Sequence, residues 1–367
     1  MSANPLRRVG ELGQSVWYDY IRRDLVTSGE LTRLIEEDGL HGMTSNPTIF
    51  QKAIAETSLY DDDIRGHAAR GKDPAAIFET LAVSDVQRAA DVFRAVYDRS
   101  NGRDGFVSIE VAPRLAHDTE GSIEEARRLW RECDRPNVMV KIPGTAEGLP
   151  AVETCLAEGI NINITLLFSV DMYWQVALAY MAGLERRRAG GQPLDRVASV
   201  ASFFVSRIDT VIDPLLPDGS PLRGQVAIAN AKRAYQHFLH LFSGDRWGRL
   251  AEAGARVQRP LWASTGTKNP AYSDVLYVEA LIGPDTVNTM PEATLDAFRD
   301  HGRIRPDAVL EKRLEPDGTL ALLAEQAIGL DTVTAQLLDD GLAAFDADLA
   351  KIVGAIESKL EAARSAA

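Results

Sequence analysis

The chain has 367 residues, of which 45% are hydrophobic and 25% are charged, and its formal net charge is −13. This length and apolar content suit one α/β barrel with insertions. The negative charge argues against a general nucleic-acid binder, so an anionic ligand would need a local basic pocket. The two cysteines, Cys133 and Cys155, are too few for a disulfide framework and lack the spacing of metal ligands. We therefore expect no metal site.

The first residues contain no apolar segment of the kind found in a secretory signal, and no apolar run is long enough to span a membrane. We therefore expect a soluble, cytoplasmic protein that has neither a membrane nor a nucleic acid as a partner.

Short β-rich runs alternate with amphipathic helical stretches along the chain. Strands that alternate with helices indicate a parallel sheet, and eight such units favour a closed (β/α)8 TIM barrel over residues 1–302. No G-x-G-x-x-G fingerprint follows the first strand, which disfavours a dinucleotide-binding fold. The predicted strands are 14–19, 40–45, 105–111, 137–142, 160–167, 198–205, 259–265 and 285–289.

Two regions exceed the minimum for such a barrel. Residues 46–104 are predicted to hold two or three extra helices. Residues 303–367 are predicted to form a C-terminal helical extension that packs on the barrel as part of the same domain, because the stretch 335–364 has apolar residues at helical spacing.

Other helices are predicted from apolar periodicity. One of them is expected to open with a capping box, because Glu125 follows Ser122 by three residues. These helices span 28–38, 83–99, 122–133, 170–188 and 227–242.

Lys141 lies in the apolar run Val138-Met139-Val140-Lys141-Ile142, which is typical of a buried strand. Burial disfavours the ammonium form, so this lysine either becomes a nucleophilic amine or pairs with a carboxylate. The pattern around Lys141 does not decide between these two interpretations.

Polar side chains gather near the ends of the other predicted strands. Active sites of α/β barrels lie at the carboxyl ends of the strands, so these residues are the candidates for chemistry. An amine, carboxylates, amides and hydroxyls together suit a Schiff-base enzyme, and Arg207 and Lys268 suit a phosphate. The candidates are Asp19, Asn46, Glu110, Asn163, Thr165, Ser202, Arg207, Ser264 and Lys268.

Each candidate also has a structural interpretation. Asp19 and Glu110 could be ion-pair partners of Lys141 or an arginine. Asn46 precedes Pro47 and could begin a helix. Residues 264–267 are either a polar loop or a phosphate-binding cup.

Two segments resemble the signature motifs of transaldolases, namely 42–50 (GMTSNPTIF) and 138–148 (VMVKIPGTAEG). Three others, 108–111 (SIEV), 161–169 (NINITLLFS) and 202–208 (SFFVSRI), occur in the order and context of that family. The resemblance covers most of residues 15–290. The length and the C-terminal extension are similar to a bacterial subgroup.

The resemblance implies a class I aldolase-type barrel with Lys141 as the Schiff-base lysine. Asp19 resembles the general acid/base, and Glu110 and Thr165 resemble the pair that holds a catalytic water. Better-known members carry an arginine two residues after the serine of the seventh strand, whereas Gly266 stands there in this chain. The implied substrate-binding residues are Asn46, Asn163 and Ser202 for the dihydroxyacetone unit, Phe204 as a lining aromatic residue, and Arg207, Ser264 and Lys268 for phosphates.

The implied activity is transfer of a dihydroxyacetone unit in the pentose phosphate pathway. The donor would be sedoheptulose 7-phosphate or fructose 6-phosphate, and the acceptor glyceraldehyde 3-phosphate or erythrose 4-phosphate. No cofactor is expected, because the iminium ion itself accepts the electrons. The alternatives are an aldolase of the fructose-6-phosphate type that releases dihydroxyacetone, and a non-catalytic barrel that binds sugar phosphates. A monomer or a homodimer is expected.

Overall fold

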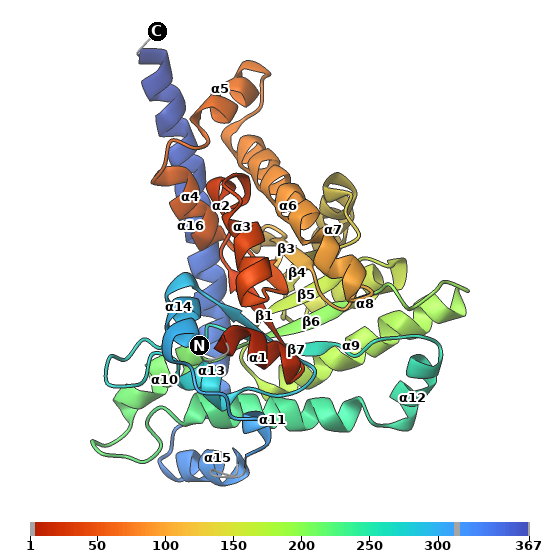
Figure 1. Cartoon of the computed structure of the whole chain (residues 1–367), viewed down its shortest axis with the longest axis vertical. Helices are drawn as coiled ribbons and strands as arrows, with labels where there is room; N and C mark the ends of the chain where they lie inside the picture. Colours follow the sequence, from red (N-terminus) through yellow and green to blue (C-terminus); the bar gives the residue numbers. More distant parts are fainter. Residues whose placement is uncertain (1–3, 312–315, 366–367) are drawn as a thin grey trace.

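The computed structural model describes residues 4–311 and 316–365. Eight parallel strands pair in chain order, and β8 pairs with β1 to close the barrel (Figure 1). This confirms the predicted (β/α)8 TIM barrel. The strands are β1 (Gln14–Asp19), β2 (Gly42–Thr44), β3 (Phe106–Glu110), β4 (Val138–Pro143), β5 (Ile162–Leu167), β6 (Ser199–Phe204), β7 (Arg259–Ala263) and β8 (Thr286–Met290).

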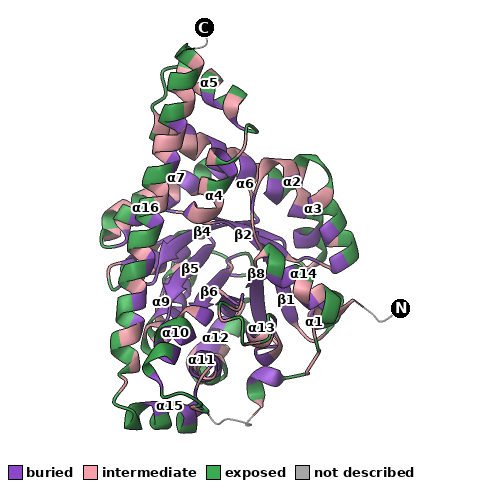
Figure 2. Cartoon of the chain, turned by 90° about the vertical axis from the view of Figure 1, so that its left-hand side faces the viewer, coloured by how far each residue is buried: buried purple, intermediate pink, exposed green. Residues whose placement is uncertain are grey.

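The strands form the centre of the core, and nearly all of their residues are buried (Figure 2). A parallel strand covered by helices is buried on both faces, which explains why these segments are continuous apolar runs in the sequence. Each predicted strand overlaps an observed one. The helices that cover the barrel are α1 (Pro5–Glu11), α2 (Arg23–Thr27), α3 (Glu30–Arg33), α7 (Thr119–Cys133), α8 (Gly148–Glu158), α9 (Val170–Ala189), α10 (Ser206–Ile212), α11 (Val226–Leu241), α12 (Asp245–Glu252), α13 (Leu276–Ala280) and α14 (Glu292–His301), with short helical turns η1 (Leu34–Asp38), η2 (Pro113–Leu115), η3 (Asp213–Leu215) and η4 (Ala308–Leu310).

Three helices lie between β2 and β3, as predicted: α4 (Pro47–Ala55), α5 (Asp61–Ala69) and α6 (Pro74–Arg99). The C-terminal region forms α15 (Pro316–Glu325) and the long α16 (Leu330–Ser365). Helix α16 runs along one side of the molecule from α15 to α5 and packs most closely against α4 (Figures 1 and 2). Within the described residues, no helix is both long and apolar enough to cross a membrane.

Three predicted helix boundaries are wrong. The predicted helix 83–99 begins earlier, at Pro74 of α6, because the side chain of Asp73 accepts a hydrogen bond from the Ala76 amide at 2.8 Å and caps the helix there.

Helix α7 begins at Thr119, because the side chain of Asp118 accepts a hydrogen bond from the Gly121 amide at 3.0 Å and caps the helix. The predicted capping residue Ser122 lies inside this helix and donates to the Leu115 carbonyl instead.

The predicted helix 28–38 is the third wrong boundary. It divides into α3 and the wider π-helical turn η1, which ends at Gly39 in the left-handed conformation.

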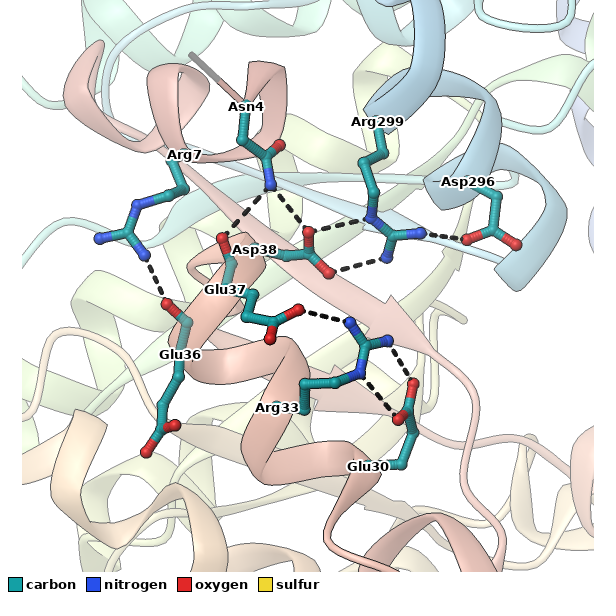
Figure 3. A network of polar contacts seen from close by, with 9 residues as sticks. All are labelled: Asn4, Arg7, Glu30, Arg33, Glu36, Glu37, Asp38, Asp296 and Arg299. Carbon is teal, nitrogen blue, oxygen red and sulfur yellow. Dashed lines mark hydrogen bonds and ion pairs between the residues drawn. The ribbon is translucent and has the colours of Figure 1, made fainter. Parts of the chain in front are cut away.

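Asp38 links the end of η1 to α1 and α14 (Figure 3). Its buried carboxylate accepts two hydrogen bonds from the Arg299 guanidinium, at 2.9 and 2.7 Å, and one from the Asn4 amide at 2.8 Å. The exposed Arg33–Glu37 pair lies beside this cluster. The Asp38 cluster therefore joins the start of the chain to the helix that follows β8.

We expect Asp38→Ala to lower the free energy of unfolding by about 2 kcal/mol, because it leaves donors of Arg299 and Asn4 without their acceptor. The matched control Glu37→Gln removes an exposed pair and should cost less than about 0.5 kcal/mol. Denaturant titration of both variants measures the difference. Equal stability of the two variants would contradict a structural role for Asp38.

Candidate active site

The carboxyl ends of the strands open into a cleft of about 710 Å³. Strand register brings the predicted residues together: Lys141 on β4 is opposite Glu110 on β3 and Asn163 on β5, and Asp19 on β1 is opposite Thr44 on β2. Most of the predicted site residues line this cleft. They are Asp19, Asn46, Lys141, Thr165, Ser202, Phe204, Arg207, Ser264 and Lys268.

Lys141 is buried at the floor of the cleft, with 4% of its surface exposed. Its ammonium donates hydrogen bonds to the carboxylate of Glu110 and to the backbone carbonyl of Ser45, each at 3.0 Å. Glu110 is almost as buried as the lysine. Both interpretations of Lys141, as an ion-pair partner and as a nucleophile, are therefore compatible with the structure. The ion pair with Glu110 is present, and the amine also faces the cleft.

Burial raises the pKa of Glu110 above its ordinary value. The positive charge and hydrogen bond of Lys141 lower it, and the nearby Asp19 carboxylate raises it further. A glutamate with a raised pKa is a stronger proton acceptor than an ordinary carboxylate. Glu110 is therefore suited to exchange protons with the amine of Lys141.

Asp19 ends β1, which a single strand, β2, separates from the strand of Glu110. Burial raises its pKa. The hydroxyl of Thr44, which donates to Asp19 Oδ1 at 2.7 Å, opposes this effect. Thr44 is held by Thr289, whose hydroxyl oxygen lies 2.7 Å from its own. Asp19 is thus a carboxyl group fixed in orientation and able to act as an acid or a base.

A polar chain connects β3, β5 and β6 beneath the cleft. The amide of Asn163 donates to Ser108 Oγ at 3.0 Å and accepts from Ser202 Oγ at 2.6 Å. Asn163 is fully buried and does not line the cleft, whereas Ser202 does. Thr165 lies two residues further along β5, and its buried hydroxyl has no hydrogen-bond partner among the described residues. A buried polar atom of this kind needs a partner, which a ligand in the cleft can supply.

Arg207 begins α10 and reaches the cleft over the ring of Phe204, with its guanidinium carbon 5.3 Å from the ring centroid. Phe204 in turn packs on Phe168. Burial lowers the pKa of Arg207, and it has no carboxylate partner in the part of the chain that the structure describes. A half-buried guanidinium without a partner is a ready site for an anionic group.

The remaining predicted residues lie at the rim. Ser264 adopts a left-handed backbone conformation after β7, and its hydroxyl lies 3.0 Å from that of Ser206. Lys268 follows in the same loop and lines the cleft. Asn46 caps α4, since its side-chain oxygen accepts from the Ile49 amide at 3.0 Å. Asn46 therefore begins a helix, as one interpretation of the sequence held, while it also lines the cleft.

The cleft carries more positive than negative charge, although the whole chain is strongly acidic. Such a local field attracts phosphorylated ligands. The cationic side chains are Arg22, Lys52, Lys141, Arg207 and Lys268, and the carboxylates are Asp19, Glu56 and Glu292. No group of three or more metal-binding side chains suited to an ion is present among the described residues.

Several residues of the site have no role in the sequence-based prediction. Ser108 and Thr289 orient Asn163 and Thr44, Lys52 adds a positive charge, and Phe345 from α16 forms part of the wall. The motif 108–111 contains a signal for Ser108. Phe345 has no local signal, because its place depends on how α16 crosses the barrel.

We expect Thr44→Val to raise the pKa of Asp19 further, because it removes a hydrogen bond that favours the carboxylate. In the control Thr289→Val, the Thr44–Asp19 bond remains and the pKa should change little. Carbon-detected NMR titration of labelled aspartate measures both variants. A pKa of Asp19 that is unaltered by Thr44→Val would contradict this account of its environment.

Comparison with known proteins agrees with this geometry. The family model for transaldolase/fructose-6-phosphate aldolase matches residues 16–356. A transaldolase 2 of Nostoc punctiforme is 46% identical over 98% of this chain and 99% of its own length. Transaldolases of Saccharopolyspora erythraea and Acidothermus cellulolyticus are 47% and 48% identical, each over 98% of both chains. The chain therefore belongs to the transaldolase/fructose-6-phosphate aldolase family.

Proposed function

We propose that this protein is a transaldolase that moves a dihydroxyacetone unit between phosphorylated sugars, with Lys141 as the Schiff-base residue. The observation that carries the proposal is the buried Lys141 amine, which faces the cleft and lies 3.0 Å from Glu110. The transaldolase relatives match over nearly the whole length of this chain, which supports the same conclusion. The proposed pathway is the pentose phosphate pathway.

The first step forms the covalent bond to the donor. Glu110 accepts a proton from the Lys141 ammonium, and the free amine attacks the ketone carbon of sedoheptulose 7-phosphate or fructose 6-phosphate. The resulting carbinolamine loses its oxygen as water and becomes an iminium ion. Thr165 lies on the strand beside Lys141 and offers its unpartnered hydroxyl to this water.

The second step breaks a carbon–carbon bond. Asp19 accepts the proton of the hydroxyl on the carbon that becomes the aldehyde of the leaving aldose phosphate. The carbon–carbon bond to this carbon then breaks, and an enamine remains on Lys141. An acceptor aldehyde then enters, the enamine carbon attacks it, and Asp19 returns the proton. Ser202, Asn46 and Asn163 would hold the hydroxyls of the three-carbon unit, with Asn163 acting through Ser202.

Transfer requires that an aldehyde, and not water, intercept the enamine. Phe204 presents an apolar ring to the cleft, without a hydroxyl that could hold water there. This feature favours transfer over hydrolysis, which would make the protein an aldolase of the fructose-6-phosphate type.

Transfer from fructose 6-phosphate to erythrose 4-phosphate tests the proposed activity. Lys141→Arg should reduce it to background, because a guanidinium stays protonated and cannot attack a ketone. The control Lys72→Arg makes the same change at an exposed lysine outside the cleft and should retain the reaction. Turnover by Lys141→Arg would contradict the amine role, and steady release of dihydroxyacetone without an acceptor would identify an aldolase instead.

Arg207 is the proposed ligand of a substrate phosphate. Arg207→Met should raise the KM for fructose 6-phosphate about tenfold or more and leave the KM for unphosphorylated fructose nearly unchanged, because a charge-assisted hydrogen bond is lost.

Arg22→Met is the matched control for Arg207→Met. Arg22 also lines the cleft, but its guanidinium is already paired with Asp24, so little change is expected. An equal rise in KM for both sugars in Arg207→Met would contradict the assignment.

The cytoplasmic location and the monomeric or homodimeric state expected from the sequence remain proposals. Ser264 and Lys268 are proposed as ligands of a second phosphate, and their place at the rim of the cleft supports this.

A further inference from the structure

A second cavity, of about 330 Å³, lies beside the cleft. It is enclosed by α4, α6, η2, α7 and α16 and by the end of β3. Asn46 is the residue whose side chain lines both spaces. The two spaces are therefore adjacent to each other at Asn46.

The buried ion pair lies between the two cavities. Lys141 lines the cleft, whereas Glu110 lines the second cavity. The two residues, linked by a hydrogen bond of 3.0 Å, therefore have one member in each space. A substrate bound to Lys141 would have the second cavity directly behind the carboxylate that serves this lysine.

Helix α4 lies between the two spaces, and α16 borders both with one face. On α4, Lys52 faces the cleft and Phe50 faces the second cavity. On α16, Phe345 faces the cleft, and Leu349, one turn further on, faces the second cavity. A hydrogen bond from Thr48 to Asp348 fastens the two helices. The C-terminal extension therefore forms part of the lining of both spaces.

The second cavity leads from the surface to the ion pair. Asp73 and Arg114 at one end are exposed, and Glu110 at the other end is 6% exposed. The space is far larger than one water molecule needs, and Glu110, Glu125 and Asn46 supply polar groups along it. Water can therefore reach Glu110 without passing through the substrate cleft.

We propose that this second cavity is the water route of the Schiff-base lysine. The inference rests on the proposed function. Water released when the imine forms leaves past Glu110 through this cavity, and water that hydrolyses the imine arrives the same way. The sugar can then remain in the cleft throughout.

The exchange is balanced in atoms and charge. Lys141 begins with three protons on nitrogen and ends as an iminium ion with one. A new carbon–nitrogen bond forms, the carbon–oxygen bond of the carbinolamine breaks, and the two lost protons leave with that oxygen as water. Glu110 takes a proton from the ammonium and delivers it to the departing hydroxyl, so it is a carboxylate before and after.

Variants that fill the cavity from two opposite walls test the route. Ala76→Phe places a ring in it from α6, and Val353→Phe does so from α16. Ala95→Phe is the control, because Ala95 is exposed on the same helix as Ala76 and lies outside the cavity. Thermal unfolding of each variant shows that it is folded.

Rapid mixing with fructose 6-phosphate, followed by borohydride quenching, measures how fast the imine forms, and dilution before quenching measures how fast it is hydrolysed. We expect both rates to fall by the same factor, about fivefold or more, in Ala76→Phe and Val353→Phe, as for a gated step. The amount of imine at equilibrium should not change, because the route affects only the rates. Ala95→Phe should behave as the unaltered protein does.

Unaltered imine rates in the folded cavity variants would overturn the water route alone. A fall in the equilibrium amount of imine, with unequal effects on the two rates, would also overturn it, since that result indicates a distorted site. Absence of any imine in the unaltered protein would overturn the proposed function and the water route together.

Discussion

The site depends on an ion pair that has been taken out of water, between Lys141 on β4 and Glu110 on β3. Removing both charges from water is costly, and the pair persists because each charge has a partner and the ammonium also has the Ser45 carbonyl. The parallel register places the two residues side by side without distortion of the sheet. Breaking one side of such a pair leaves a buried charge, which typically costs about 3–5 kcal/mol.

The other features of the site follow from this pair. The Glu110 carboxylate keeps a proton acceptor within reach of the amine, and its raised pKa makes it a stronger acceptor than an ordinary glutamate. Asp19 ends β1, two strands away from Glu110, where Thr44 fixes it. Two carboxyl groups in different surroundings can therefore serve different steps, one at the nitrogen and one at the sugar hydroxyl. The positive charges at the rim are the proposed ligands of the phosphates in a chain that is otherwise acidic.

Much of the fold and of the site could be predicted from the sequence, because buried parallel strands leave a strong local pattern. All eight strands, the three helices after β2 and the C-terminal helix follow from apolar runs and helical spacing. The polar residues at strand ends identified most of the cleft, because the barrel brings those ends to one face. Lys141 stood out because a charge in an apolar strand needs an explanation.

Other features depend on contacts between distant segments and could not be predicted. Asp118 replaced Ser122 as the cap of α7, and both residue types are good caps, so the sequence alone does not choose between them. The place of Phe345 in the wall depends on the path of α16 across the barrel. The second cavity behind Glu110 depends on the packing of α16 against α4, which links residues about 300 positions apart.

The central claim is that the Lys141 nitrogen bonds covalently to the donor sugar. Mass spectrometry of peptides from protein reduced with borohydride in the presence of fructose 6-phosphate tests this claim most directly. The account predicts a single modified peptide, the one that contains Lys141, with the added mass of the reduced dihydroxyacetone unit or of the reduced sugar phosphate. An unmodified Lys141 peptide, or the same adduct on another lysine such as Lys268, would contradict it.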